Sequence, residues 1–252
     1  RWKGDWIEDV DMRGYGVVGG EVGRIMKMVD GGLLWVDAHD GPQAQTRFVL
    51  RKALENGVKP VVVINKIDRE NAEPHRAVDM VFDLFVELKA TDEQLDFPIV
   101  YASAKNGVAT RELSEKNDDL TPLFQAIVQH VPPPKISPEP FFQMLVSNLH
   151  YSDYLGRIAL GRIVSGCVSV GDSITCIHSD GRRERSVVTA LFTYEGLEQV
   201  QIKRATAGDI VGLAGFEEIY IGETLADSEE REPLQFVDID PPTIRLHILG
   251  ND

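Results

Sequence analysis

Residues 59–68 read KPVVVINKID, a short apolar run that ends in a group of polar side chains. Four consecutive Val or Ile residues in a run of this length are typical of a strand buried on both faces of a parallel sheet. Two further runs have the same character, GGLLWVD at 31–37 and FPIVYAS at 97–103. We therefore expect three parallel strands in one sheet, at residues 31–37, 59–65 and 97–103.

Amphipathic segments separate these three runs. Apolar residues recur at helical spacing within residues 42–55, 78–88 and 123–131. This alternation of strands and helices predicts an α/β fold with a doubly wound, mostly parallel sheet. In such a fold the ligand lies beyond the carboxyl ends of the strands.

The character of the chain changes after residue 131. Five prolines fall within residues 132–140, which favours a stiff, extended linker. Beyond them, period-two alternation and turn glycines predict a small antiparallel β-barrel. The expected strands are 155–164, 173–177, 185–192 and 209–214.

This pattern divides the chain into three parts. We expect an α/β domain at residues 1–134 and the barrel at 135–237. Residues 238–252 contain another strand-like run, TIRLHIL, and are expected to begin a third domain that is cut short.

The composition indicates the class of protein and its expected location. The chain is 43% hydrophobic and 26% charged, as ordinary soluble proteins are. No apolar run reaches the roughly 18–20 residues of a membrane span, and two cysteines favour a reduced, cytoplasmic location. The net charge of −14 argues against broad, non-specific nucleic-acid binding. A monomer is the default expectation.

The polar group after residues 59–64 suits recognition of guanine. The Asp68 carboxylate could accept hydrogen bonds from both guanine N1–H and the exocyclic N2–H. Adenine has no matching pair of donors, so an acid buried against it would be unpaired. Asn65 could tie this loop to its neighbours, and the Lys66 stem could cover the purine face. By itself, N-K-x-D also occurs by chance.

A second polar loop follows the next predicted strand. Ser103, Ala104 and Lys105 stand where a backbone N–H could point at guanine O6. Because both loops fall at the carboxyl ends of adjacent parallel strands, they share one rim of the sheet. This joint placement makes a guanine site much more specific than either motif alone.

The phosphate-binding motifs are weak or missing. Asp11-Met12-Arg13-Gly14 gives D-x-x-G, in which the acid could hold a magnesium-bound water and the Gly14 N–H could meet the γ-phosphate. A surface turn explains four such residues equally simply. No G-x-x-x-x-G-K followed by Ser or Thr occurs in the 252 residues, so the usual triphosphate cradle is missing.

Other polar residues have two interpretations. The arginines at 182, 183 and 185 form either a local basic face or a solvated hairpin edge. The aromatic group of His150, Tyr151 and Tyr154 could stack on bases, but tyrosines on a barrel surface are commoner. Cys167 and Cys176 are most simply small core residues.

Four strings resemble the translational GTPases, and most of all their BipA/TypA group. They are VDAHDGPQAQTRFVLRKALENGVKPVVVINKIDR at 36–69, ATDEQLDFPIVYASAKNGVA at 90–109, NLHYSDYLGRIALGRIVSGCVSVGD at 148–172 and AGDIVGLAGFEEIYIGETLAD at 207–227. The resemblance implies a P-loop-GTPase-type sheet followed by a barrel of the translation-factor domain II type.

The resemblance also assigns roles to particular residues. It implies that Asn65, Lys66 and Asp68 read the base, that residues 103–105 support them, and that Asp11 with Gly14 face the γ-phosphate and Mg²⁺. The implied cofactors are GTP or GDP with Mg²⁺. The implied partner is the ribosome, through its rRNA and proteins, in stress adaptation and ribosome assembly, with hydrolysis stimulated there.

One stretch departs from the family pattern. DTPGHADFGGEV is expected, and residues 11–22 read DMRGYGVVGGEV. Tyr15 stands at the position of the family histidine that orients the attacking water, a role to which a phenol of pKa about 10 is poorly suited. Arg13 replaces a proline and Val17 an acid. The P-loop and first switch region should precede these residues, so we expect a fragment of a GTPase.

Two other interpretations stay open. The altered stretch also fits a degenerate module that docks on the ribosome without catalysis. A relative of elongation factor G is a third possibility. A P-loop in the reading frame upstream of Arg1 would favour the enzyme.

Overall fold

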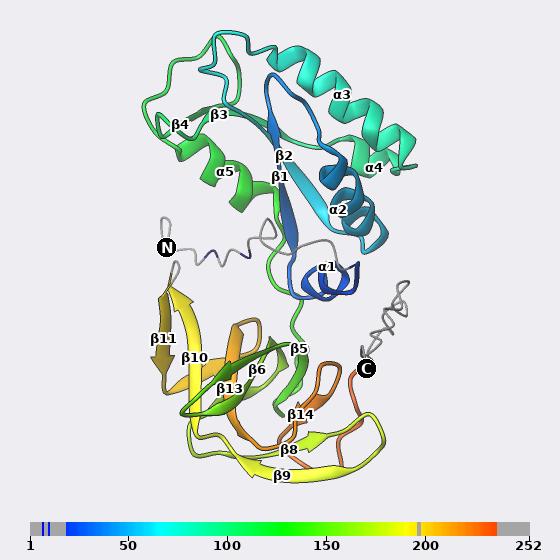
Figure 1. Cartoon of the computed structure of the whole chain (residues 1–252), viewed down its shortest axis with the longest axis vertical. Helices are drawn as coiled ribbons and strands as arrows, with labels where there is room; N and C mark the ends of the chain where they lie inside the picture. Colours follow the sequence, from blue (N-terminus) through cyan, green and yellow to red (C-terminus); the bar gives the residue numbers. More distant parts are fainter. Residues whose placement is uncertain (1–6, 8–9, 11–18, 196–197, 236–252) are drawn as a thin grey trace, which may run out of the picture.

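The structure is a computed structural model that describes residues 7, 10, 19–195 and 198–235 (Figure 1). It consists of an α/β part and a β-barrel that follow each other along the chain. None of the helices in these described stretches combines the length and apolar character needed to cross a bilayer.

The α/β part contains a four-stranded sheet in the order β1-β2-β3-β4. The first three strands are parallel, and β4 is antiparallel to β3. The expected mostly parallel sheet is therefore confirmed. Its strands are β1 (Gly31–Asp37), β2 (Lys59–Asn65), β3 (Ile99–Ser103) and β4 (Val108–Thr110).

The third strand begins two residues later than residues 97–103 suggested. Pro98 has no N–H to give to a ladder, although its carbonyl accepts a hydrogen bond from Val62 N. Phe97 instead packs on Phe85, with ring centroids 4.5 Å apart. The apolar character of Phe97 thus reflects packing against a helix rather than a place in the strand.

Helices cover both faces of the sheet (Figure 1). Val62 and Ile64 of β2 pack on one face with Phe85 of α3, while Val61 and Val63 pack on the other with α5. All four β2 residues are almost completely buried, which is why this strand is apolar without interruption. The helices are α1 (Gly19–Ile25), α2 (Ala44–Glu55), α3 (Pro74–Glu87), α4 (Asp92–Leu95) and α5 (Thr121–His130).

The second part is an antiparallel sheet in the order β11-β10-β13-β6-β5-β14-β8-β9, with the pair β12-β7 beside it. One continuous apolar cluster fills its interior, as a small barrel requires. Its strands are β5 (Gln143–Ser152), β6 (Gly156–Ser165), β7 (Cys167–Ser169), β8 (Ser173–Ile177), β9 (Arg183–Val187), β10 (Ala190–Glu195), β11 (Glu198–Ile202), β12 (Arg204–Thr206), β13 (Ile210–Phe216) and β14 (Thr224–Ala226).

The single strand expected at 185–192 was wrong, because the chain divides there into β9 and β10. Val188 N still bonds to Asp172 O, in register with the β8–β9 ladder, whereas Thr189 N bonds to Ala214 O, so the chain leaves β8 after Val188 and passes to β13. At this crossing a Cβ on Gly215 would lie 2.1 Å from Val187 O, and its φ of +132° also requires glycine. The two halves of the sheet approach here and close the barrel.

The two parts meet at the turn that leads into β1. Arg162 of β6 places its Nη1 3.0 Å from Asp30 Oδ1 and 3.3 Å from the Met28 carbonyl. Both charged side chains are largely buried. The proline-rich segment 132–140 runs between the parts as irregular, extended chain, as the sequence predicted.

Candidate functional site

The ends of β1, β2 and β3 are tied together by Asn65. Its side-chain Oδ1 accepts a hydrogen bond from Ala104 N at 3.0 Å, and its carbonyl accepts one from Ala38 N at 2.8 Å. Ile67 N donates to Ala102 O at 3.3 Å and strengthens the same junction. The three loops therefore form one rim, and Asn65 is the residue that connects them.

Asp68 lies beside Ser103 on this rim. A hydrogen bond from the nearly fully buried Ser103 hydroxyl, aided by the charges of Lys105 and Arg69, holds the pKa of Asp68 below its usual range. Asn106 N donates to Ser103 Oγ at 3.3 Å, so the hydroxyl is itself fixed. The Asp68 carboxylate is exposed to solvent in the absence of a base. A bound base removes water from it, and this desolvation makes the missing hydrogen bonds to adenine costly.

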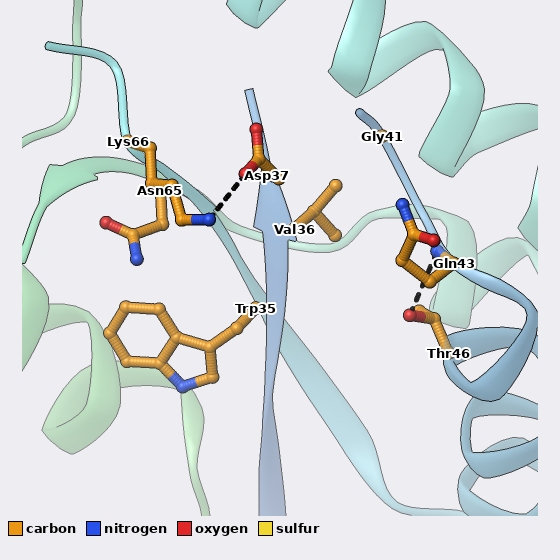
Figure 2. A pocket seen from close by; sticks show the side chains of 8 residues that line it. All are labelled: Trp35, Val36, Asp37, Gly41, Gln43, Thr46, Asn65 and Lys66. Atoms are coloured by element: carbon orange, nitrogen blue, oxygen red, sulfur yellow. Dashed lines mark hydrogen bonds and ion pairs between the residues drawn. The ribbon is translucent and has the colours of Figure 1, made fainter. Parts of the chain in front are cut away.

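Lys66 points in a different direction from Asp68. Its backbone has a φ of +63°, a left-handed conformation that costs a non-glycine residue about 1 kcal/mol or more. In this conformation its amino group lies 2.7 Å from Asp37 Oδ2 (Figure 2). The Lys66 stem thus runs along the rim towards β1, and its charge is neutralised by the residue that ends that strand.

Asp37 is a polar residue that the sequence analysis did not single out. Partial burial acts to raise its pKa, but hydrogen bonds from Lys66 and from the backbone N–H groups of His39 and Asp40 outweigh it and hold the pKa at about 2. Arg69 lies 3.1 Å from the same carboxylate oxygen. The signal was available, because Asp37 ends a predicted parallel strand just as Asn65 does.

A pocket of about 220 Å³ opens beside β1 (Figure 2). The half-exposed Trp35 and the start of α2, where Gln43 N donates to Thr46 Oγ1, form part of its wall. Asp68 and residues 103–105 do not line it. Its lining residues are Trp35, Val36, Asp37, Gly41, Gln43, Thr46, Asn65 and Lys66.

The structure thus brings together five of the sequence-predicted residues and turns a sixth, Lys66, towards β1. The five are Asn65, Asp68, Ser103, Ala104 and Lys105. Asp11, Gly14 and Tyr15 lie outside the described residues.

Family comparisons agree with this architecture. Residues 2–133 match the family described as elongation factor Tu GTP binding domain, and residues 156–226 match elongation factor Tu domain 2. Over the whole chain, the sequence is 47% identical to a large ribosomal subunit assembly factor BipA from Synechocystis sp. and 44% identical to one from Bacillus subtilis.

The chain belongs to the BipA/TypA group of translational GTPases. It spans about two fifths of the length of these BipA relatives, 42% of the Synechocystis protein and 41% of that from B. subtilis. The BipA/TypA resemblance of the four sequence strings is thereby confirmed.

Solved translation factors share the fold of this BipA-type chain. Elongation factor SelB from Methanococcus maripaludis, in complex with the GTP analogue GppNHp, superposes with a TM-score of 0.62 over 82% of this chain and 43% of its own. The apo form of SelB gives the same score over 80% and 40%. At 22% sequence identity, this likeness establishes the fold alone.

Proposed function

We propose that this chain is the guanine-recognising and barrel portion of a ribosome-associated GTPase that acts in assembly of the large ribosomal subunit. The names of its BipA relatives support the assembly role. The observation that carries the proposal is the 3.0 Å bond between Asn65 Oδ1 and Ala104 N, which joins the two loops that the sequence assigned to the base.

Asp68 is proposed to select guanine. Its lowered pKa keeps the carboxylate ionised at neutral pH, so both oxygens are acceptors for guanine N1–H and N2–H. The hydrogen bond from the Ser103 hydroxyl orients this carboxylate. Lys66 covers the base with its stem while its amino group is held by Asp37.

The loop at residues 103–105 is proposed to meet guanine O6. Because Ala104 N already donates to Asn65 Oδ1, a base that uses this donor has to share it. The hydrogen bond between Ala104 N and guanine O6 therefore depends on where Asn65 holds the loop. A purine without O6 cannot form this hydrogen bond.

The phosphates and Mg²⁺ complete the proposed cofactor, GTP or GDP. The 252 residues hold no P-loop, so they do not fit a triphosphate-bound Mg²⁺, and no step of hydrolysis is assigned to them. In the parent protein Mg²⁺ would stabilise charge on the phosphates. Asp11 and Gly14 are proposed to face the γ-phosphate and the magnesium-bound water, and Tyr15 to occupy the position of the family histidine.

The proposal extends to organisation and partners. We assign residues 1–134 to the GTP-binding domain, 135–237 to the barrel and 238–252 to the start of a third domain. The partners are ribosomal RNA and ribosomal proteins, the location is cytoplasmic and the chain is a monomer.

Asp68→Asn tests the base assignment. The amide can donate to the O2 of xanthine, whereas it cannot accept both guanine donors. Loss of a charge-assisted hydrogen bond of about 1.5–3 kcal/mol should weaken guanine binding roughly 10- to 100-fold and favour xanthine nucleotides. Calorimetric titration of GDP and XDP into the parent protein measures this, with Asp83→Asn, exposed on α3, as the matched control.

Retained guanine preference in the Asp68→Asn protein would remove Asp68 from the site. The 252-residue chain itself should bind GTP or GDP weakly and hydrolyse GTP negligibly, because it lacks the phosphate cradle. Tight binding with steady turnover by this chain would contradict the proposal.

A further inference from the structure

Three polar side chains lie together inside the barrel, far along the chain from the nucleotide rim. Cys176 is in β8, His178 follows that strand, and Glu223 directly precedes β14, which pairs with β8. Their exposed fractions are 1%, 4% and 3%. Barrel interiors are normally apolar, so a sulfur, an imidazole and a carboxylate in one place need a physical reason.

The three side chains direct ligand-type atoms at one another. His178 Nδ1 lies 2.8 Å from Glu223 Oε1, and Cys176 Sγ lies 3.5 Å from Glu223 Oε2 and 3.9 Å from His178 Nδ1. Zinc bonds of about 2.0–2.3 Å in a tetrahedron place ligand atoms about 3.2–3.8 Å apart. The two sulfur distances already come close to this spacing, and the Nδ1–Oε1 distance has to open by about half an ångström.

The surroundings of the cluster match those of a metal site. His178 Nε2 is buried without a hydrogen-bond partner among the described residues, and Glu184 Oε2 lies 3.5 Å away from it. A histidine that ligates a metal commonly gives its second N–H to a carboxylate, and Glu184 is a carboxylate close enough to Nε2 to take that place after a small shift of its side chain. On the other side, Tyr220 N donates to Glu223 Oε2 at 2.8 Å and fixes that carboxylate.

We propose that Cys176, His178 and Glu223 bind a zinc-type divalent transition-metal ion that stabilises the barrel. The donor atoms are one sulfur, one imidazole nitrogen and the carboxylate oxygens of Glu223, a mixed set that suits zinc and not magnesium. The site therefore differs from the nucleotide-bound Mg²⁺ in ligand chemistry and in place. It does not depend on the proposed GTPase function.

Binding at this site displaces a proton. Burial, together with the neighbouring Glu223 carboxylate, raises the pKa of the Cys176 thiol. The thiol is thus neutral without metal, and its proton leaves to solvent when the ion takes the thiolate. The proton that His178 Nδ1 shares with Glu223 Oε1 also has to leave Nδ1, and in a neutral imidazole it passes to Nε2, which faces Glu184. No electron is transferred, and the cysteine stays reduced.

Cobalt titration of the metal-stripped, folded 252-residue chain tests the site. Co²⁺ should bind once per chain and give a near-ultraviolet thiolate-to-cobalt band with intense visible bands of tetrahedral cobalt, which Zn²⁺ then removes. Cys167→Ser is the matched control, because it deletes the other free cysteine and should leave the spectrum unchanged. Cys176→Ser should abolish the thiolate band.

A graded series sharpens the test. Glu184→Gln should weaken Co²⁺ binding by about 10- to 100-fold, as expected of a residue that only supports a ligand. Cys176→Ser should weaken it more. Absence of the thiolate band in the folded wild-type chain would overturn the proposal, as would loss of the band in Cys167→Ser with retention in Cys176→Ser. The wild-type result decides even if a variant fails to fold.

Discussion

The rim of the α/β part and the polar cluster of the barrel differ in exposure: the rim presents polar side chains to solvent, and the barrel buries them. At the rim, Asp68, Lys66 and Lys105 are exposed and are positioned by loops that a parallel sheet gathers at one edge. In the barrel, Cys176 and Glu223 are buried in the interior and form a hydrogen bond with each other. The comparison teaches that the exposed rim can change its side chains at little cost in stability, whereas the buried cluster cannot.

The largest expected effect is at the buried cluster. Glu223→Ala leaves the His178 ring and Tyr220 N without their partner, and loss of one member of a buried pair costs about 3–5 kcal/mol. Urea unfolding of the 252-residue chain measures this change. Asp68→Ala at the rim is the matched control and should change the free energy of unfolding by less than about 0.5 kcal/mol. Similar changes in the free energy of unfolding for both variants would contradict the difference between the exposed rim and the buried cluster.

An intermediate effect is expected at Asp37, which joins the rim to the edge of the core. Its folded pKa of about 2 lies below the ordinary 3.8. The stability that it contributes is therefore present above about pH 4 and is lost as the pH falls through 2. After a discount for the exposed Lys66 and Arg69 partners, this stability is about 1–2 kcal/mol.

Asp37→Asn should therefore destabilise the chain at pH 7 and match the wild type at about pH 2. Unfolding curves across this range measure the difference. Asp83→Asn, exposed on α3, should show no such pH dependence. A constant difference between Asp37→Asn and the wild type at every pH would show that its ionisation is not the cause.

Of the three positions at which a substitution should destabilise the chain, Asn65 should show the smallest effect. Asn65→Ala removes the acceptor for Ala104 N, a single hydrogen bond at the half-exposed rim worth about 1 kcal/mol. Guanine binding by the parent protein should fall more steeply, because two loops lose their connection. Denaturation and GDP titration of the same variant separate these two quantities. An unchanged GDP affinity would mean that Asn65 serves stability alone.

Sequence reasoning was strongest where one strand is buried on both faces. Residues 59–65 were predicted with their observed bounds, because four apolar residues in succession leave few alternatives. The placement of Asn65 beside the loop at Ala104 followed from the parallel order of β2 and β3. Periodicity and topology together were sufficient there.

The failures have local physical causes. The β5 strand was not predicted, because its register shifts between Val146 and Asn148 interrupt the alternation of apolar residues. The break between β9 and β10 depends on the hydrogen bond from Thr189 N to Ala214 O, a residue distant in sequence. Contacts between residues distant in sequence do not produce a periodic pattern of apolar residues from which they could be predicted.

The barrel cluster was missed for a related reason. Cys176 was interpreted as a small core residue, and the structure does bury it. Its partner Glu223 is 47 residues away and enters the interior only because β14 pairs with β8. Likewise, Asp37 acquires its partners from the loop after β2. Side-chain partners of this kind are set by three-dimensional pairing.

The contact between Arg162 and the turn before β1 shows how firmly the barrel and the sheet are held together at this point. Nη1 of Arg162 bonds to Asp30 and Met28, whereas its Nη2 is buried without a hydrogen-bond partner among the described residues. An orphaned buried donor costs about 1–3 kcal/mol, which offsets much of what the ion pair contributes. The contact of Arg162 with Asp30 and Met28 therefore adds little net free energy to the joint between barrel and sheet, so breaking this contact costs little.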